Sequence, residues 1–197
     1  LCTGAPSFAR RPVQLRAAAS FDTVSQTVVG GMRIGGRRAF GDLSLGSSHI
    51  KAWDASSFVV GAIIGYQVAL SSKGRIQFCP AASVGLKIGP HNIQDSGFDY
   101  GANEWGLGGV IGVLATHTGQ IELMPTLSFT FVHVTQRLTD NTTTFTTSKS
   151  ESAEFIALGV GLVHRQQWSF KPILSIGLPG GATGFAFALT YSLGHSE

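Results

Sequence analysis

The sequence offers few side chains that could carry chemistry, because only 13% of its 197 residues are charged. Some of these charges alternate with small residues along period-two segments and share the small-residue side: Arg75, Lys87, Glu122, Arg165 and Lys171. An unpaired charge in a narrow, poorly hydrated interior is costly, so opposite charges there are expected to pair. We expect a network in which Glu122 faces several cations. It serves either as an ion gate in a narrow pore or as a structural layer that fixes strand register.

No other motif points to catalysis or to a cofactor. A nucleophile needs a neighbouring base and an orienting group, and no such set stands out. The glycine-rich segment 106–112 lacks the following Lys and Ser/Thr of a phosphate-binding loop. The six histidines are scattered without metal-ligand spacing: His49, His91, His117, His133, His164 and His195. We therefore expect a protein that is not an enzyme and that holds no metal or cofactor.

The composition excludes several classes of protein. An ordinary soluble domain has about 25% charged residues and about 7% glycine, whereas this chain has 26 glycines and a net charge of only +3. A nucleic-acid binder usually clusters its basic residues into a patch or stripe, so no nucleic-acid partner is expected. A transmembrane helix needs about 18 apolar residues, and the longest apolar stretch, Phe58 to Tyr66, is too short and contains glycines.

The elements that must position these side chains are β-strands, because apolar residues recur with period two and many glycines interrupt the apolar runs. Strands in globular proteins have about five or six residues, and about 9–11 residues cross a bilayer at a tilt. The expected strands are long enough to cross. They are Ala39–His49, Ser57–Leu70, Arg75–Gly89, Glu104–His117, Gln120–Val132, Ser152–Gln166, Trp168–Leu178 and Ala182–Leu193.

The two faces of these strands differ in a way that is unsuited to a soluble barrel. In Trp168–Leu178, one face carries Trp, Phe, Pro, Leu and Ile, and the other carries Ser, Lys and Gly with a single Ile. Bulky uncharged side chains suit lipid, and small polar ones fit the narrow interior of an eight-stranded barrel. Alternation of this kind is typical of a transmembrane β-barrel. The sequence thus predicts an all-β, eight-stranded, antiparallel up-and-down transmembrane barrel.

The connections between the strands predict an orientation. Short turns at 71–74, 118–119 and 166–167 alternate with longer polar connections at 50–56, 90–103 and 137–151, although the last outer connection, 179–181, is short. Outer-membrane barrels have short turns on the periplasmic side and longer loops outside. With an even number of strands, both termini are therefore expected in the periplasm.

The pattern resembles that of small bacterial outer-membrane barrels of the OmpA, OmpX and opacity-protein type, over about residues 39–193. The last strand is similar to the aromatic signal read by the barrel-assembly machinery, with Leu193 where that signal usually has an aromatic residue. Its outward residues are Phe185, Phe187, Leu189, Tyr191 and Leu193. The resemblance implies a Gram-negative outer membrane, contact with membrane lipids and lipopolysaccharide, and the assembly machinery as partner.

The resemblance leaves the function open between several classes. We expect a structural or interaction barrel that acts as a membrane anchor or as a binding module with surface loops. The alternative is a narrow pore or a transport barrel for small solutes. A lipid-modifying enzyme is a third interpretation, since His133-Val134-Thr135 resembles the His-x-Ser of outer-membrane lipid A deacylases, with Thr in place of Ser. A soluble lipocalin-like carrier would need a charged outer face.

Residues 1–38 fall outside the alternating pattern and are expected as a basic N-terminal tail or a residual targeting segment. Arginines and small residues dominate the first twenty residues, and such a composition also suits an organellar transit peptide. An organellar envelope membrane is therefore a minor alternative location. The tail or the outer loops could bind a protein partner. Residues 194–197 are expected as a short C-terminal extension.

The remaining observations concern cysteine and aromatic residues. A bridge between Cys2 and Cys79 would pin the tail into the lumen in an oxidising periplasm; otherwise two free thiols are expected. Aromatic residues near strand ends are typical of the belts at membrane interfaces. The residues expected there are Trp53, Trp105, Trp168, Tyr66 and Tyr191.

Overall fold

The computed structural model describes residue 2 and residues 11–36, 38–71, 75–90, 97–118, 120–143, 145–178 and 183–194. None of these residues forms a helix long and apolar enough to cross a membrane. Most of them lie in strands, as the period-two pattern predicts. The strands are β1 (Val13–Phe21), β2 (Ser25–Gly35), β3 (Ala39–Ile50), β4 (Ala55–Tyr66), β5 (Val68–Ala69), β6 (Ile76–Ile88), β7 (Phe98–Val113), β8 (Thr116–Thr118), β9 (Ile121–Asp140), β10 (Thr146–His164), β11 (Trp168–Leu178) and β12 (Thr183–Leu193).

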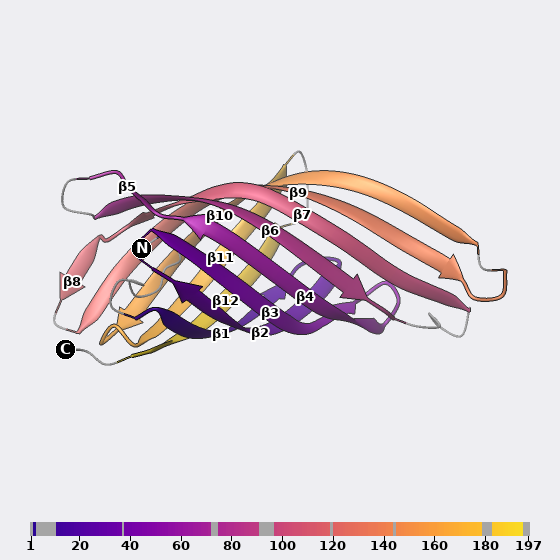
Figure 1. The fold of residues 1–197 in the computed structure, drawn as a ribbon, viewed down its shortest axis with the longest axis horizontal. Coiled ribbons are helices and arrows are strands. Elements are labelled where there is room, and N and C mark those ends of the chain that lie inside the picture. The colour runs from indigo at the N-terminus through magenta and orange to yellow at the C-terminus, as the bar shows by residue number, and fades with distance from the viewer. Residues whose placement is uncertain are drawn as a thin grey trace.

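Ten of these strands pair into one closed antiparallel barrel (Figure 1). The ring runs from β1 through β2, β3, β4, β6, β7, β9, β10 and β11 to β12. The short β5 and β8 pair with β6 and β9. A seam between the first and last strands closes the ring, from Val13 opposite Leu193 to Phe21 opposite Phe185. Closure pairs the backbone groups of both end strands, which an open sheet would leave exposed.

The prediction of eight strands is wrong, because residues 13–35 form β1 and β2 and complete the wall. This stretch belongs to segment 1–38, which was expected as a tail. Its alternation is weak because the outward side of β1 includes the small Ala17 and Ala19. Of the basic residues of segment 1–38, Arg11 is buried, and Arg16 and Arg33 point into the barrel interior. The wall therefore contains one hairpin, β1–β2, that the alternation of bulky and small residues does not predict.

The hairpin of β9 and β10 extends beyond its neighbour β11. Its pairing runs from His164 opposite Ile121 to Thr146 opposite Thr139, whereas β11 pairs with β10 only from Glu154 onward. The connection expected at 137–151 is therefore mostly strand. Both strands are polar there, so no apolar alternation marks them. Figure 1 shows this hairpin projecting from the end of the barrel opposite the termini.

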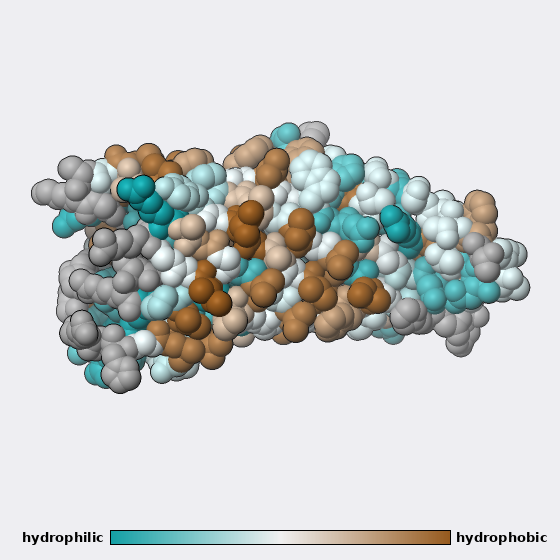
Figure 2. All heavy atoms as spheres, in the orientation of Figure 1, coloured by the Kyte–Doolittle hydropathy of each residue, from teal (hydrophilic) through white to brown (hydrophobic). Residues whose placement is uncertain are grey.

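The wall carries its bulky apolar side chains outward. Many large hydrophobic residues are more than half exposed, among them Leu43, Leu45, Ile64, Val84, Leu107 and Leu158. Figure 2 shows apolar side chains gathered over the middle of the visible face, with polar ones toward the end of the β9–β10 hairpin. Apolar side chains on the outer surface, with smaller and more polar side chains in the interior, are typical of a barrel that is surrounded by lipid. This arrangement confirms the predicted transmembrane β-barrel.

Close strand contacts require glycine at an inward position of β2. A Cβ atom on Gly31 would lie 2.3 Å from the backbone oxygen of Leu43, whereas a Cβ on the neighbouring Gly30 would meet nothing within 4 Å. We expect Gly31→Ala to lower the free energy of unfolding by about 1–3 kcal/mol, because the β2–β3 pair must move apart. Gly30→Ala is the matched control and should be neutral or stabilising by about 0.5 kcal/mol. Urea unfolding in lipid vesicles measures both, and equal effects would contradict the steric explanation.

Candidate functional site

The barrel interior contains a cavity of about 240 Å³. Inward-facing positions alternate with the exposed ones, so neighbouring strands each contribute small or polar side chains to it. Its basic lining residues are Arg16 on β1, Arg33 on β2 and Lys171 on β11. Its lining also includes the bulky apolar residues Phe40, Ile63, Val110 and Ile173. The cavity thus combines basic groups with an apolar surface.

Asp42 on β3 binds both arginines of the cavity. Its Oδ2 accepts hydrogen bonds from Arg33 Nε at 2.9 Å and Arg16 Nη1 at 3.1 Å, and Arg33 Nη2 lies 2.7 Å away. The Asp42 side chain is only 1% exposed, so these contacts take place out of water. The register explains the arrangement, because Arg33 lies directly opposite Asp42 in the β2–β3 pair. One carboxylate therefore serves two guanidinium groups.

Lys171 lies on the other side of the β1–β12 seam. It is opposite Ala188 on β12 and extends over Gly159 on β10, where a Cβ would lie 2.7 Å from Lys171 Cε. Within the described parts of the chain, no hydrogen bond or ion pair engages Lys171, and no carboxylate lines the cavity. The basic charge of this lining therefore exceeds what Asp42 can balance.

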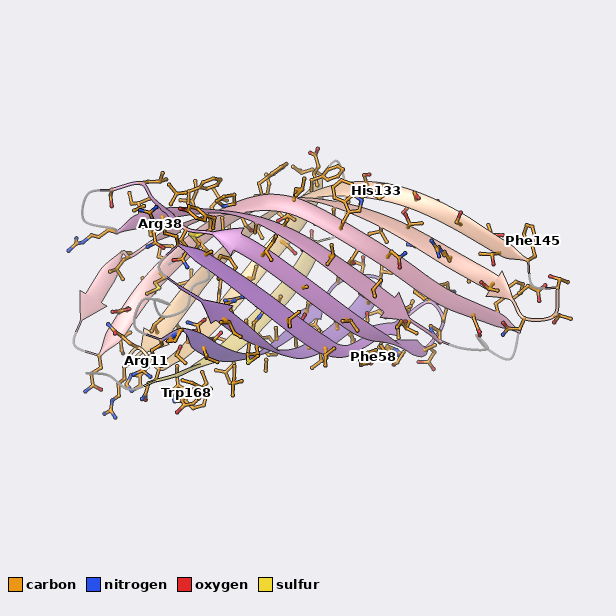
Figure 3. The ribbon with its side chains drawn as sticks, in the orientation of Figure 1. Arg11, Arg38, Phe58, His133, Phe145 and Trp168 are labelled. Carbon is orange, nitrogen blue, oxygen red and sulfur yellow. A yellow bond between two sulfur atoms is a disulfide. The ribbon has the colours of Figure 1, made fainter. Side chains whose placement is uncertain are left out.

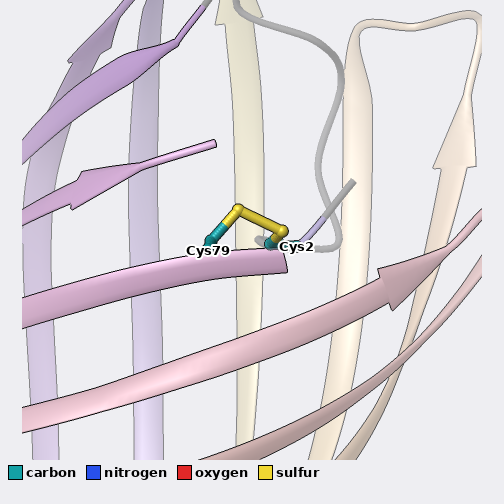
Figure 4. The surroundings of a disulfide bond; sticks show 2 residues. All are labelled: Cys2 and Cys79. Atoms are coloured by element: carbon teal, nitrogen blue, oxygen red, sulfur yellow. A yellow bond between two sulfur atoms is a disulfide. The ribbon is translucent and has the colours of Figure 1, made fainter. Parts of the chain in front are cut away.

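A disulfide joins Cys2 to Cys79 inside the barrel (Figure 4). Their Cα atoms are 6.0 Å apart, and both residues are almost completely buried. Cys79 faces inward on β6 and, with Cys2, lines the same cavity as the basic residues. Of the two interpretations left open by the sequence, the structure contains the bridge. Cys2 is therefore held in the lumen.

The residues of the predicted charge network occupy different places. Lys171 lines the cavity, whereas Glu122 accepts a hydrogen bond from Gln166 Nε2 at 3.2 Å. Arg165 is exposed and donates through Nε to Gln120 Oε1 at 2.5 Å. Arg75 is also exposed, and Lys87 faces inward near the far end of β6. Pairing of Glu122 with several cations stays a prediction.

Sequence reasoning missed the residues that build the cluster at the cavity. Arg16 and Arg33 fall in segment 1–38, which was expected as a basic tail, and Asp42 was not singled out. A weak signal was present, because Arg16 lies at every-second-residue spacing with Gln14, Ala18 and Ser20, on the same side of β1. The pairing of Arg33 with Asp42 depends on the register of β2 with β3, which the sequence pattern alone does not fix.

The aromatic residues expected at the membrane interfaces differ in their surroundings. Trp168 is exposed and packs on Tyr191, with ring centroids 4.5 Å apart, and Tyr66 is also exposed. Trp105 contacts Phe131 and His133 on β9. Trp53 packs edge-on against the buried Tyr100, 4.9 Å away. Figure 3 shows Trp168 near the end of the barrel that carries the termini and Phe145 at the opposite end. A role as interface belts stays a prediction.

The residues of the expected assembly signal lie on β12 and point away from the lumen. Most of them are strongly exposed, as are the other bulky residues of the wall: Phe185, Phe187, Leu189 and Leu193, with Tyr191 half-buried against Trp168. Recognition of this strand by an assembly machinery stays a prediction. Among the described residues, no group of three or more His, Cys, Asp or Glu side chains could hold a metal ion.

The tip of the β9–β10 hairpin is fixed by Asp140. Its Oδ2 accepts from Thr143 Oγ1 at 2.7 Å, and its Oδ1 accepts from the Thr142 backbone N–H at 2.8 Å. These hydrogen bonds, that of Thr143 first, hold the pKa of Asp140 below its ordinary value. Since the pKa is lowered in the folded state, the contribution of this turn is complete above the ordinary pKa. It is lost only as the pH falls through the lowered value.

Comparison with known proteins gives weak likenesses only. No protein-family model and no curated protein sequence matches the chain. CdiB from Acinetobacter baumannii aligns with 89% of this chain at 14% identity and a TM-score of 0.48, and the chain spans 34% of CdiB. A KdgM porin in complex with disordered oligogalacturonate aligns with 91% of this chain and 99% of its own, at 9% identity and a TM-score of 0.43. The Pseudomonas putida toluene transporter TodX aligns with 100% of this chain and 71% of its own, at 12% identity and a TM-score of 0.39.

Proposed function

We propose that this chain is a bacterial outer-membrane barrel whose lumen passes small solutes. The observation that carries the proposal is the cavity lined by Arg16, Arg33 and Lys171 inside a closed wall with an apolar exterior. A ten-stranded barrel is wider than an eight-stranded one, so its interior has room that side chains need not fill. Closed barrels are also the only β-structures that span a membrane without unsatisfied backbone groups.

The orientation follows from the two rims. An even-numbered ring places both termini at one end, where β10 joins β11 through residues 165–167 and β2 joins β3 through residues 36–38. The projecting β9–β10 hairpin lies at the other end. Because outer-membrane barrels keep short turns in the periplasm, the termini belong to the periplasmic side. Surface proteolysis that cuts at the hairpin and spares the termini supports this orientation.

Passage of solutes is tested in planar bilayers with the refolded, oxidised protein. The expected result is discrete conductance steps that favour anions, because fixed cations in the lumen attract them. Ala188→Phe places a bulky side chain in the cavity lining and should reduce the steps, whereas Ala62→Phe on the outward side of β4 should leave them unchanged. A correctly folded wild-type barrel without conductance would contradict the proposal, whatever the variants do.

A second candidate function is that of a surface binding module. The observation that favours it is the polar extension of β9 and β10 beyond β11. Residues 146–152 of this extension are exposed and include an ion pair between Lys149 and Glu151. This function predicts that shortening the hairpin abolishes adhesion of cells to a surface or partner while conductance is unchanged.

A further inference from the structure

The charge of the cavity lining sets the sign of its ligand. Arg16 and Arg33 share the single carboxylate of Asp42, and Lys171 approaches the same space from β11. The described residues of the lining supply hydroxyl groups, from Ser83, Thr130 and Thr190, and include no Asp or Glu. A lumen with more fixed cations than carboxylates favours a negatively charged guest, and charge-assisted hydrogen bonds are the strong ones.

The apolar part of the cavity lining indicates what the uncharged part of the ligand should be. Phe40 and Ile63 lie on one part of the lining, and Val110 and Ile173 come from strands elsewhere in the ring. Sites for small molecules typically combine apolar walls with a few placed polar groups. A cavity of about 150 Å³ can hold benzene. The present volume of about 240 Å³ therefore has room for a benzene-sized body and an attached carboxylate.

We propose that the lumen cavity binds a small organic anion, with its carboxylate between Lys171 and Arg16 and its compact apolar body against Phe40 and Ile63. This inference rests on the proposed function, since it names the class of solute that the lumen would pass. Inorganic anions lack the apolar body, and apolar hydrocarbons lack the charge. Both should therefore bind more weakly than a molecule that has the two together.

The binding test uses benzoate as the probe, with benzamide as its uncharged analogue and acetate as the carboxylate without a ring. Titration calorimetry and ligand-detected NMR on the oxidised, full-length barrel in micelles give the affinities. We expect benzoate to bind about tenfold or more tightly than either analogue, because only benzoate uses the charged and the apolar parts of the site together. Equal affinities for benzoate and benzamide, or no binding of benzoate to the folded barrel, would overturn the proposal.

Variants locate the site. Lys171→Met keeps the length of the side chain and removes its charge, and should weaken benzoate about tenfold while benzamide is unaffected. Lys87→Met is the matched control, since Lys87 also faces inward but does not line the cavity. Benzoate affinity that is unchanged by Lys171→Met would overturn the placement. If Lys171→Met does not fold, Lys171→Arg should retain the preference for benzoate over benzamide, and loss of that preference would count against the site.

The outcomes separate this inference from the proposed function. A barrel that conducts ions but does not distinguish benzoate from benzamide contradicts the inference alone. A barrel that binds benzoate through Lys171 but never conducts contradicts the proposed function alone. Heat-modifiable gel migration establishes in each case that the protein under study is folded.

Discussion

Asp42→Asn is expected to lower the free energy of unfolding of the barrel by about 3–5 kcal/mol, because removing one partner leaves a buried charge uncompensated. Arg33 and Arg16 would then face each other and Lys171 without the carboxylate that both now contact. The Arg33 side chain is only 9% exposed, so water can replace little of the contact that Asp42 makes there. Asparagine keeps the shape of the side chain, so the loss measures charge and not packing.

Urea unfolding in lipid vesicles, followed by tryptophan fluorescence and gel migration, measures this effect. Asp54→Asn is the control, because the Asp54 side chain is 94% exposed and asparagine tolerates its positive φ of 48°. Its stability should change by less than about 0.5 kcal/mol. In an Arg33→Met background, the cost of Asp42→Asn should become smaller, since the two residues interact. An Asp42→Asn barrel as stable as the wild type would refute the assigned role of this carboxylate.

Reduction of the disulfide is expected to lower the free energy of unfolding by about 2–4 kcal/mol. The bond joins residues 77 positions apart, and opening so long a loop gives the unfolded chain much additional freedom. The chain-entropy relation gives about 4.5 kcal/mol for a loop of this length. The measured value should be lower, because Cys2 also gains freedom in the folded, reduced protein.

The comparison requires unfolding of the oxidised protein with and without a phosphine or dithiol reductant. The double variant Cys2→Ser/Cys79→Ser should have the stability of the reduced protein and no response to reductant. If reductant leaves the wild-type midpoint unchanged even though the thiols have been shown to be free, the bond does not stabilise the barrel.

Most of the wall could be predicted from the sequence because lipid imposes a simple rule on it. In β4, β6, β9, β11 and β12 the outward positions are bulky and the inward ones mostly small or polar, so period two is visible. β1 and β2 were not predicted as strands because Ala17, Ala19 and Gly30 take outward positions there. Small side chains can face lipid, but they do not produce a visible alternation of bulky and small residues. The number of strands was therefore wrong although the kind of barrel was right.

The β9–β10 extension and the candidate site were not predicted from the sequence, for different reasons. Residues 146–152 are exposed on both faces of the strand and are mostly polar, so no apolar alternation reveals this part of β10. The cluster at Asp42 depends on which residues lie opposite one another across three strands, and register is a property of the folded sheet. Only Lys171 of the cavity's charged residues was singled out, since it lies in a strand with clear alternation.

The seam between β1 and β12 also governs how the chain can reach its folded state. Its partners lie far apart in the sequence, Val13 opposite Leu193, so the ring cannot be completed before β12 has been synthesised. Contacts between such distant residues slow folding, because the entropy of a long loop is lost before they form. Unpaired strand edges are not tolerated in hydrocarbon. Insertion into the bilayer and joining of the two terminal strands must therefore be one coupled, late event.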